Sequence, residues 1–207
     1  MPTLLHLDSS PLDSSISREL TREFVKTWKT AHPDGSVIYR DVAAHKAQPI
    51  DAKWIGAAYT PEESLTAGQK EELAFSEELI GELQKADEYV FGVAMHNFSI
   101  PSTLKLWIDQ IARVGRTFSY GERGPKGLII GKKATFIIAT GGIYDAQTQM
   151  ASFNFVEPYL RSVFGFLGVT DATFLTAGGT SVLNQGKDRT AFLAPHLQTV
   201  QTHAQTF

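Results

Sequence analysis

Short apolar runs alternate with longer amphipathic segments along almost the whole of this 207-residue chain. The apolar runs have the length of buried strands, and between them apolar residues recur at helical spacing. Strands joined by helical crossovers run parallel, because each crossover returns the chain to the same edge of the sheet. The alternation therefore predicts one α/β domain over residues 1–207, a five-stranded parallel sheet with helices on both faces. The expected strands are residues 3–8, 36–41, 88–94, 133–140 and 171–177.

Five helices are expected between and after these strands. Thr66 and Gln69 form a capping box before the second helix, and Gly168 suits the C-cap of the fourth. Pro195 should lie in the first turns of the last helix or kink it, and residues 46–65 should be irregular. Five strands in this order suit the flavodoxin-like form of the doubly wound fold. The helical stripes are Leu20, Phe24, Trp28 and Ala31; Phe75, Leu79 and Leu83; Leu104, Trp107, Ile108 and Ile111, with Lys105, Asp109 and Arg113 on the polar side; Leu160, Val163, Phe164 and Leu167; and Leu193, Leu197, Val200 and Ala204.

The composition excludes several kinds of site and partner. The chain has no cysteine, so disulfides, thiolate metal ligands and cysteine nucleophiles are ruled out. Its six histidines are scattered without paired metal-ligand spacing, so no metal site is expected. A net charge of -3 gives no electrostatic footprint for nucleic acid. Because no run has membrane-spanning length and no signal-peptide pattern occurs, we expect a cytoplasmic protein without membrane contact.

Three segments that follow predicted strands are rich in small and polar residues, namely residues 9–17, 95–101 and 140–145. In doubly wound sheets, ligands bind outside the carboxyl ends of the strands. The first segment offers serine hydroxyls and main-chain amides at a helix N-terminus, which favours a phosphate. It lacks the glycine-rich dinucleotide fingerprint and the Gly-Lys-Ser/Thr loop, so a phosphomonoester is expected. Capping and turn formation by the same serines is the structural alternative.

The other two segments suit the ring of a flat ligand. Asn97 and main-chain groups can hydrogen-bond a heterocycle, while Met95 and Phe98 offer apolar walls. His96 is a candidate base, although a lone loop histidine more often lies at the surface. Gly141 and Gly142 allow close backbone approach, and their amides could stabilise anionic charge, although a glycine pair also ends strands. One flat, phosphorylated ligand would use all three segments.

Several motifs in a fixed order make the chain similar to the FMN-dependent NADH azoreductase family, the flavodoxin-like quinone and azo-dye reductases once labelled acyl-carrier-protein phosphodiesterases. The resemblance runs almost end to end. It is carried by residues 9–17, here called the serine segment, and by the Met-x-Asn-Phe sequence at 95–98. The other motifs are "TFSYGERGPKGLIIGKK" (117–133), the Gly-Gly pair at 141–142, and "PYLRSVFGFLGVTD" (158–171).

The resemblance implies a set of FMN contacts and a quaternary structure. Family members are homodimers with two flavins near the interface, and the segment around Phe118 and Tyr120 approaches the site as part of the substrate slot, together with Phe98. The family often has Ser-Arg where this chain has Ala139-Thr140, and Tyr where it has His96, which bears on substrate preference more than on FMN binding. The implied contacts are Ser10, Ser15, Ile16 and Ser17 for the phosphate, Met95, His96, Asn97 and Phe98 for the ring and ribityl chain, and Ala139, Thr140, Gly141 and Gly142 for the pyrimidine end.

The implied activity is reduction of quinones and cleavage of aromatic azo compounds with NADH or NADPH. Each round would be a ping-pong transfer of two electrons through flavin N5, with small planar aromatic acceptors. No side chain is then required as a nucleophile, which matches a sequence without a catalytic triad or paired carboxylates. Three alternatives stay open: a flavodoxin-type electron carrier for a protein partner, a non-redox phosphate-binding module of the same fold, and an FAD-using quinone reductase.

Overall fold

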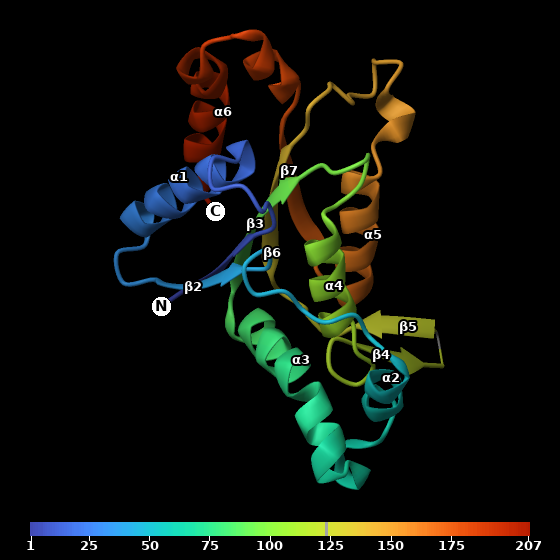
Figure 1. Cartoon of the computed structure of the whole chain (residues 1–207). Coiled ribbons are helices and arrows are strands. Elements are labelled where there is room, and N and C mark those ends of the chain that lie inside the picture. Colours follow the sequence, from blue (N-terminus) through green and yellow to red (C-terminus); the bar gives the residue numbers. More distant parts are fainter. Residues whose placement is uncertain (123) are drawn as a thin grey trace.

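A parallel sheet of five strands lies at the centre of the computed structural model, which describes residues 1–122 and 124–207 (Figure 1). The strand order is β2-β1-β3-β6-β7, and every neighbouring pair is parallel. The predicted five-stranded flavodoxin-like fold is therefore confirmed. Arg123, within the 117–133 motif, lies outside the described residues. The strands are β1 (Thr3–Asp8), β2 (Ser36–Asp41), β3 (Glu88–Ala94), β6 (Lys133–Ala139) and β7 (Asp171–Ala177).

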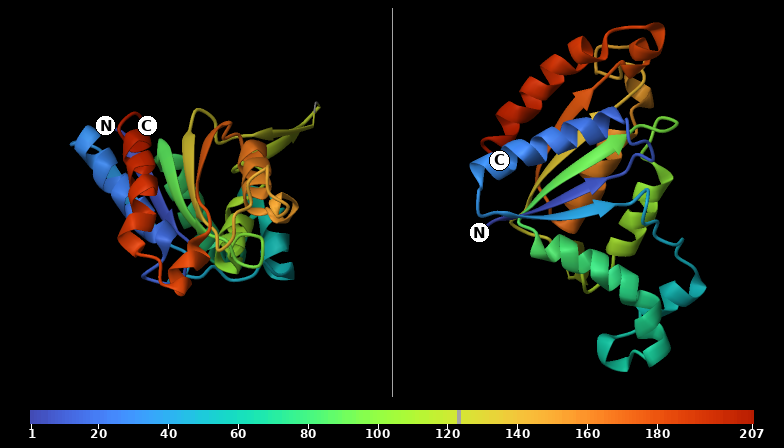
Figure 2. Two further views of the ribbon diagram at one scale, coloured as in Figure 1. Left: turned by 90° about the horizontal axis from the view of Figure 1, so that it is seen from above. Right: turned by 60° about the vertical axis from the view of Figure 1, so that its left-hand side comes forward.

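Helices cover both faces of this sheet (Figure 2). Alternate residues of a strand point to opposite faces, and the core divides accordingly. Leu4 and Val90 face one cluster of apolar side chains, with α1 and α6, whereas Leu5 and Phe91 face another, with α3, α4 and α5. The helices are α1 (Ile16–Ala31), α3 (Ala67–Lys85), α4 (Ser102–Ile111), α5 (Val156–Leu167) and α6 (Arg189–Ala204).

Stacked aromatic rings hold α4 and α5 against the sheet. Phe91 of β3 and Phe136 of β6 are register partners, and their rings stack at 4.9 Å. Phe164 of α5 meets both rings edge-on at 5.0 and 4.9 Å, and Trp107 of α4 lies 5.8 Å from Phe91. All four side chains are buried. This packing sets the position of the segments that precede α4 and α5.

Two parts of the chain differ from the sequence prediction. The stretch 46–65 is not wholly irregular, because it contains α2 (Ala52–Ala58) and a 3-10 turn, η1 (Glu62–Ser64). Asp51 caps α2 through the Trp54 amide, and buried Trp54 donates to Gln110 of α4. A hairpin that was not predicted, β4 (Phe118–Gly121) with β5 (Gly124–Gly127), follows α4. Both elements are too short for a hydrophobic period to identify them.

The helix ends also refine the prediction. The Thr66–Gln69 capping box is present, and Gly168 ends α5 in the left-handed conformation. Lys105 and Asp109 pair on the polar side of α4, but Arg113 is not part of that stripe, because the helix ends at Ile111. The structure buries Arg113 against Glu77 instead, at 2.7 Å. Pro195 lies inside α6, within its first two turns.

Two further 3-10 turns, η2 (Ala151–Phe153) and η3 (Thr180–Gln185), follow β6 and β7. In the part of the chain that the structure describes, no helix is both long and apolar enough to span a bilayer.

Candidate functional site

The three segments singled out from the sequence meet at one edge of the sheet. They follow β1, β3 and β6, which are adjacent strands that run in the same direction. Two hydrogen bonds join the start of a segment to the neighbouring strand: the Met95 amide donates to the Ala139 carbonyl of β6 at 2.9 Å, and the Ser9 amide donates to the Gly92 carbonyl of β3 at 3.0 Å. The chain leaves β1 for β2 on one side and reaches β3 on the other, so the site lies at the point where strand order reverses.

The first turn of α1 presents unsatisfied hydrogen-bond donors. Ser15 occupies the N-cap position, but its hydroxyl bonds Ser17 at 3.0 Å and caps no amide. Among the described residues, no acceptor pairs with the amides of Ile16, Ser17 and Arg18, although all three residues are buried. Buried amides are nearly always paired. These donors therefore form a candidate binding site for an anion such as a phosphate.

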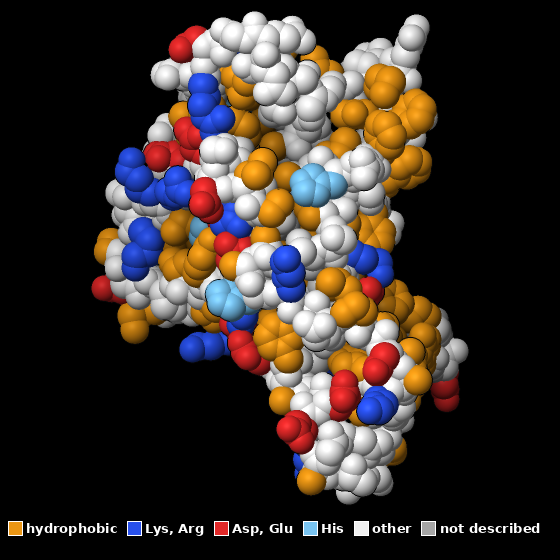
Figure 3. Space-filling model, in the orientation of Figure 1, with side chains coloured by type: hydrophobic (Ala, Val, Ile, Leu, Met, Phe, Trp, Pro, Cys, Tyr) orange, Lys and Arg blue, Asp and Glu red, His pale blue; other side chains and the backbone are white. Residues whose placement is uncertain are grey.

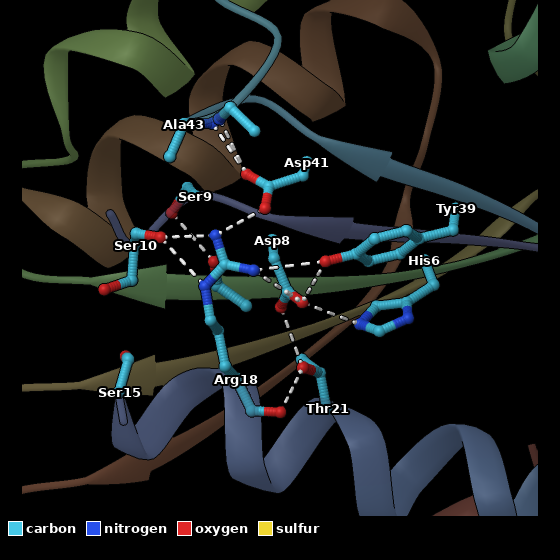
Figure 4. Close-up of polar contacts among 12 residues, drawn as sticks. His6, Asp8, Ser9, Ser10, Ser15, Arg18, Thr21, Tyr39, Asp41 and Ala43 are labelled. Carbon is cyan, nitrogen blue, oxygen red and sulfur yellow. Dashed lines mark hydrogen bonds and ion pairs between the residues drawn. The ribbon is translucent and has the colours of Figure 1, made fainter. Parts of the chain in front are cut away.

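The predicted phosphate residues are brought together there, with different roles. Ser15, Ile16 and Ser17 lie at the start of α1, and Ser10 lies across from them (Figure 4). The Ser10 hydroxyl accepts from the Leu12 amide at 3.3 Å. Ser9, in contrast, donates its hydroxyl to the Gly92 carbonyl at 2.8 Å and is a structural residue.

The segment after β3 forms a tight reverse turn. His96 and Ser99 exchange two main-chain hydrogen bonds, at 2.9 and 3.1 Å, so Asn97 and Phe98 occupy the tip. Both tip residues have positive φ, 48° and 70°. Each such conformation costs on the order of 1 kcal/mol in a residue other than glycine, and it is concentrated at functional sites. Met95 packs on the core, whereas His96, Asn97 and Phe98 are exposed.

Aromatic residues of the segment after β6 surround the Phe98 ring. Phe153 lies 5.2 Å and Tyr144 6.3 Å from it, and the Phe98 carbonyl accepts from the Phe155 amide at 3.0 Å. A cavity of ≈ 440 Å³ adjoins the same turn. It is lined by His96, Asn97, Ser99, Ile100, Ser102, Lys105 and Tyr159. Tyr144, Phe153 and Phe155 were not predicted as site residues, although Tyr144 lies in the segment 140–145, because isolated aromatic residues in an irregular segment show no period.

The glycine pair after β6 is held by its carbonyls. The Gly141 carbonyl accepts from the Ser181 amide at 3.1 Å, and the Gly142 carbonyl accepts from Gly179 at 3.0 Å and from the Thr140 hydroxyl at 2.7 Å. Within the described part of the chain, the Gly141 and Gly142 amides have no acceptor. Ala139 and Thr140 are buried. The site thus has free amides at two places, the start of α1 and this glycine pair.

One chain does not bring Phe118 and Tyr120 to Phe98. Phe118 packs at 4.7 Å on Phe166, at the last turn of α5. Phe98, in contrast, binds the Phe155 amide just before the first turn of α5. At a rise of about 1.5 Å per residue, the helix separates these two points by roughly 16 Å. Their place in a substrate slot stays a prediction that requires a second copy of the chain.

A buried charged cluster beneath the serine segment was not anticipated. Arg18 lies between Asp8 and Asp41, at 3.6 and 2.8 Å, and Tyr39 donates to Asp8 at 3.2 Å. Burial would raise the pKa of Asp41, but the amides of Ala44 and Ala43 and the Arg18 guanidinium hold it below its usual value. An arginine in the first turn of an amphipathic helix resembles a solvated residue, so Arg18 gives no sign of burial in the sequence. Asp8, a charged residue at the end of a buried strand, was the feature that could have indicated a buried charged cluster.

A second cavity lies away from this candidate site. A cavity of ≈ 790 Å³, larger than the one beside the Asn97–Phe98 turn, lies between α2, α3 and the turn after α4. That turn follows the last residue of α4, whereas the Asn97–Phe98 turn precedes the first. Volume alone would therefore select the wrong end of the molecule.

A family described as having a flavodoxin-like fold matches residues 2–204. The FMN-dependent NADH:quinone oxidoreductase of Acidobacterium capsulatum is 58% identical over 99% of this chain and 100% of its own length. A protein of the same name from Nostoc punctiforme is 46% identical over 97% of each chain.

Solved structures agree with this assignment. The azoreductase of Bacillus anthracis superimposes with a TM-score of 0.90 at 25% identity, covering 100% of each chain. An FMN-dependent NADH-azoreductase from the same species, solved in complex with FMN, gives 0.88 at 27% identity, covering 100% of this chain and 99% of its own. The resemblance seen in the sequence is confirmed. With a match over nearly its whole length and the strand order of that fold, the chain belongs to the flavodoxin-like family that includes these reductases.

Proposed function

We propose that the protein is an FMN-dependent NADH:quinone oxidoreductase that also reduces aromatic azo compounds. The observation that carries the proposal is the pair of free-amide sites at one edge of the sheet, one at the start of α1 and one at Gly141–Gly142. A ligand with an anionic tail and a polar ring edge would use both. The names of the curated relatives and the FMN complex of a structural neighbour support the same ligand.

The start of α1 would hold the phosphate of FMN. The amides of Ile16, Ser17 and Arg18 supply donors, and the positive end of the helix dipole favours a dianion. Among the described residues, the hydroxyls of Ser15 and Ser17 bond only each other, and they can reorient toward phosphate oxygens. These groups fit a phosphomonoester.

The remaining residues would hold the isoalloxazine ring. Bound FMN supplies the redox chemistry, a hydride transfer from NADH and two electrons to the acceptor. Met95 and Phe98 provide apolar contact, and the Asn97 amide group can bond the ring edge. The free amides of Gly141 and Gly142 would stabilise negative charge at the pyrimidine end, because fixed dipoles need no reorganisation.

The exposed aromatic surface fits planar acceptors and a second copy of the chain. Met150, Phe153 and Phe155 are 40%, 43% and 56% exposed, and Phe98 contacts the last two. Figure 3 shows a cluster of exposed hydrophobic side chains at the upper right, where Figure 1 places this segment. An apolar patch rimmed by polar residues is typical of an interface or ligand site. A homodimer would cover it and let Phe118 and Tyr120 of one copy approach the other's site. We place the enzyme in the cytoplasm, where NADH is supplied.

The proposal is tested with the purified protein. FMN should bind, and anaerobic NADH should bleach the yellow colour in a single two-electron phase. Menadione or methyl red should then restore the colour, and NADPH in place of NADH measures donor preference. A protein that retains no yellow colour after incubation with FMN and removal of the free flavin would refute the proposal. Stepwise one-electron reduction with no quinone turnover would favour an electron carrier instead.

A further inference from the structure

A charged cluster lies directly beneath the segment proposed to bind phosphate. The Arg18 guanidinium rises from the first turn of α1, and its side chain is only 8% exposed (Figure 4). Its Nη2 lies 2.8 Å from Asp41, its Nη1 lies 3.6 Å from Asp8, and Nη1 donates to the Tyr39 hydroxyl at 3.1 Å. Burying one cation between two carboxylates removes all three from water at a cost. Because of this cost, the cluster is poorly explained by a contribution to overall stability, and a role in shaping the neighbouring segment explains it better.

Neighbouring residues hold the Asp8 carboxylate tightly in place. Thr21 donates to its Oδ1 at 2.9 Å, and His6 Nε2 lies 3.3 Å from its Oδ2. On the neighbouring strand, Gly92 leaves the necessary room, since a Cβ there would lie 2.5 Å from Asp8 Oδ1. Asp8 is thus rigidly held, and it holds Arg18 in turn.

Arg18 uses this rigid position to bind the serine segment itself. Its Nε and Nη2 donate to the Ser10 carbonyl at 2.9 and 2.6 Å. Its remaining guanidinium nitrogens face Tyr39, Asp8 and Asp41, so among the described residues the donors of Arg18 are engaged within the protein. Arg18 therefore acts on the shape of the segment.

The shape matters because a free carbonyl beside a helix N-terminus competes for its amides. The unpaired amides of α1 are normally satisfied by a cap or by a nearby acceptor. If the Ser10 carbonyl turned toward these amides, it would accept hydrogen bonds from them and occupy the place where an anion would bind. We propose that Arg18 is a positioning residue for the phosphate of FMN, which keeps the Ser10 carbonyl turned away and the first turn of α1 open. This inference rests on the proposed function.

A second arginine makes the same kind of contact from the other side. Arg189, at the start of α6, donates to the Ser14 carbonyl at 2.9 Å and pairs with Glu19 at 2.6 Å. Its side chain is 42% exposed, so water competes for these bonds. The Ser10 and Ser14 carbonyls are thus each bound by a guanidinium group, and the buried contact of Arg18 should matter more.

The test compares FMN with riboflavin, which lacks the phosphate. Arg18→Lys keeps the charge but loses the planar fork that donates twice to Ser10 while bonding Asp41. We expect the dissociation constant of FMN, measured by quenching of flavin fluorescence, to rise about tenfold, or about 1.4 kcal/mol. The constant for riboflavin should stay within about twofold, because a factor of two is only about 0.4 kcal/mol. Arg189→Lys should give a smaller change in the same direction.

Arg40→Lys is the matched control. Arg40 is half-buried, with an 11% exposed side chain, and it also pairs with two carboxylates, Glu78 and Glu82. It contacts no part of the serine segment. This variant should lose thermal stability like Arg18→Lys and leave the ratio of the FMN and riboflavin constants unchanged.

The outcomes separate the inference from the proposed function. Wild-type protein that binds neither flavin refutes the proposed function, and the inference falls with it. Wild-type protein that prefers FMN, with Arg18→Lys showing the same preference, refutes the inference alone. Equal losses of FMN and riboflavin affinity would also refute it, since they indicate a general structural role. If Arg18→Lys does not fold, Asp41→Asn decides, because it weakens one partner of Arg18 and keeps the bonds from Ala43 and Ala44.

Discussion

Replacing Ile16 by proline would remove a single proposed phosphate donor with little change in the backbone. Ile16 is the first residue of α1, where proline is favoured because its missing N–H has no partner within the helix. Ser15 already has φ -61° and ψ 137°, the extended conformation that a following proline requires. In the free protein the Ile16 amide bonds no acceptor among the described residues, so its loss breaks no internal hydrogen bond.

The expected effect follows from the charge of the acceptor. A hydrogen bond to a charged group contributes roughly 1.5–3 kcal/mol, which corresponds to a loss of FMN affinity on the order of tenfold to a hundredfold. Riboflavin affinity should be unchanged. The assay is a fluorescence titration of apoprotein with each flavin.

Because the Ile16 side chain is buried, Ile16→Val is the control. It trims the side chain at a stability cost of about 0.5–1.5 kcal/mol and keeps the amide. Equal affinity of the proline and valine variants for FMN would show that this amide does not bind the phosphate.

Three further predictions concern stability and the turn after β3. Gly92→Ala should lower the free energy of unfolding in urea by about 1–3 kcal/mol, because the new Cβ lies 2.5 Å from Asp8 Oδ1 and 3.0 Å from Thr21 Cγ2. Gly81→Ala, inside α3 with nothing within 4 Å, should raise it by up to about 1 kcal/mol; equal effects of the two would contradict the packing argument. Burial lowers the pKa of His203, against the opposing charge of Asp171, and its Nε2 lies 2.9 Å from the Thr135 hydroxyl. The folded protein therefore favours the neutral imidazole of His203. This contribution to stability is complete above the unfolded pKa of about 6.5 and is lost as the pH falls below it. His203→Gln should reduce the fall in Tm between pH 7 and pH 5, and an unchanged slope would assign the effect to another group. Asn97→Gly should raise Tm, because positive φ carries no strain in glycine, and should weaken flavin binding if the Asn97 side chain bonds the ring.

Much of the fold and part of the site could be predicted because their signals are local. Apolar runs such as residues 133–139 and helical stripes such as Leu104–Ile111 depend on neighbours in the chain, and the five strands of the central sheet and the five long helices were predicted. Ser15, Asn97 and Gly141 were anticipated for the same reason, since each follows a strand that could be identified. The short elements α2, β4 and β5 were missed, because a few residues carry no readable period.

Contacts between distant segments account for what the chain's pattern left open. The order β2-β1-β3-β6-β7 makes the three segments neighbours, and no local period encodes it. Arg18 reads as a solvated helix residue until Asp8 and Asp41, ten and 23 positions away, close around it. Phe118, which the sequence resemblance places near the site, packs on Phe166 at the last turn of α5, so only a second copy of the chain could bring it to a flavin site. Periodicity reports which side of an element is buried; the partner that buries it depends on free energies of packing summed over the whole molecule.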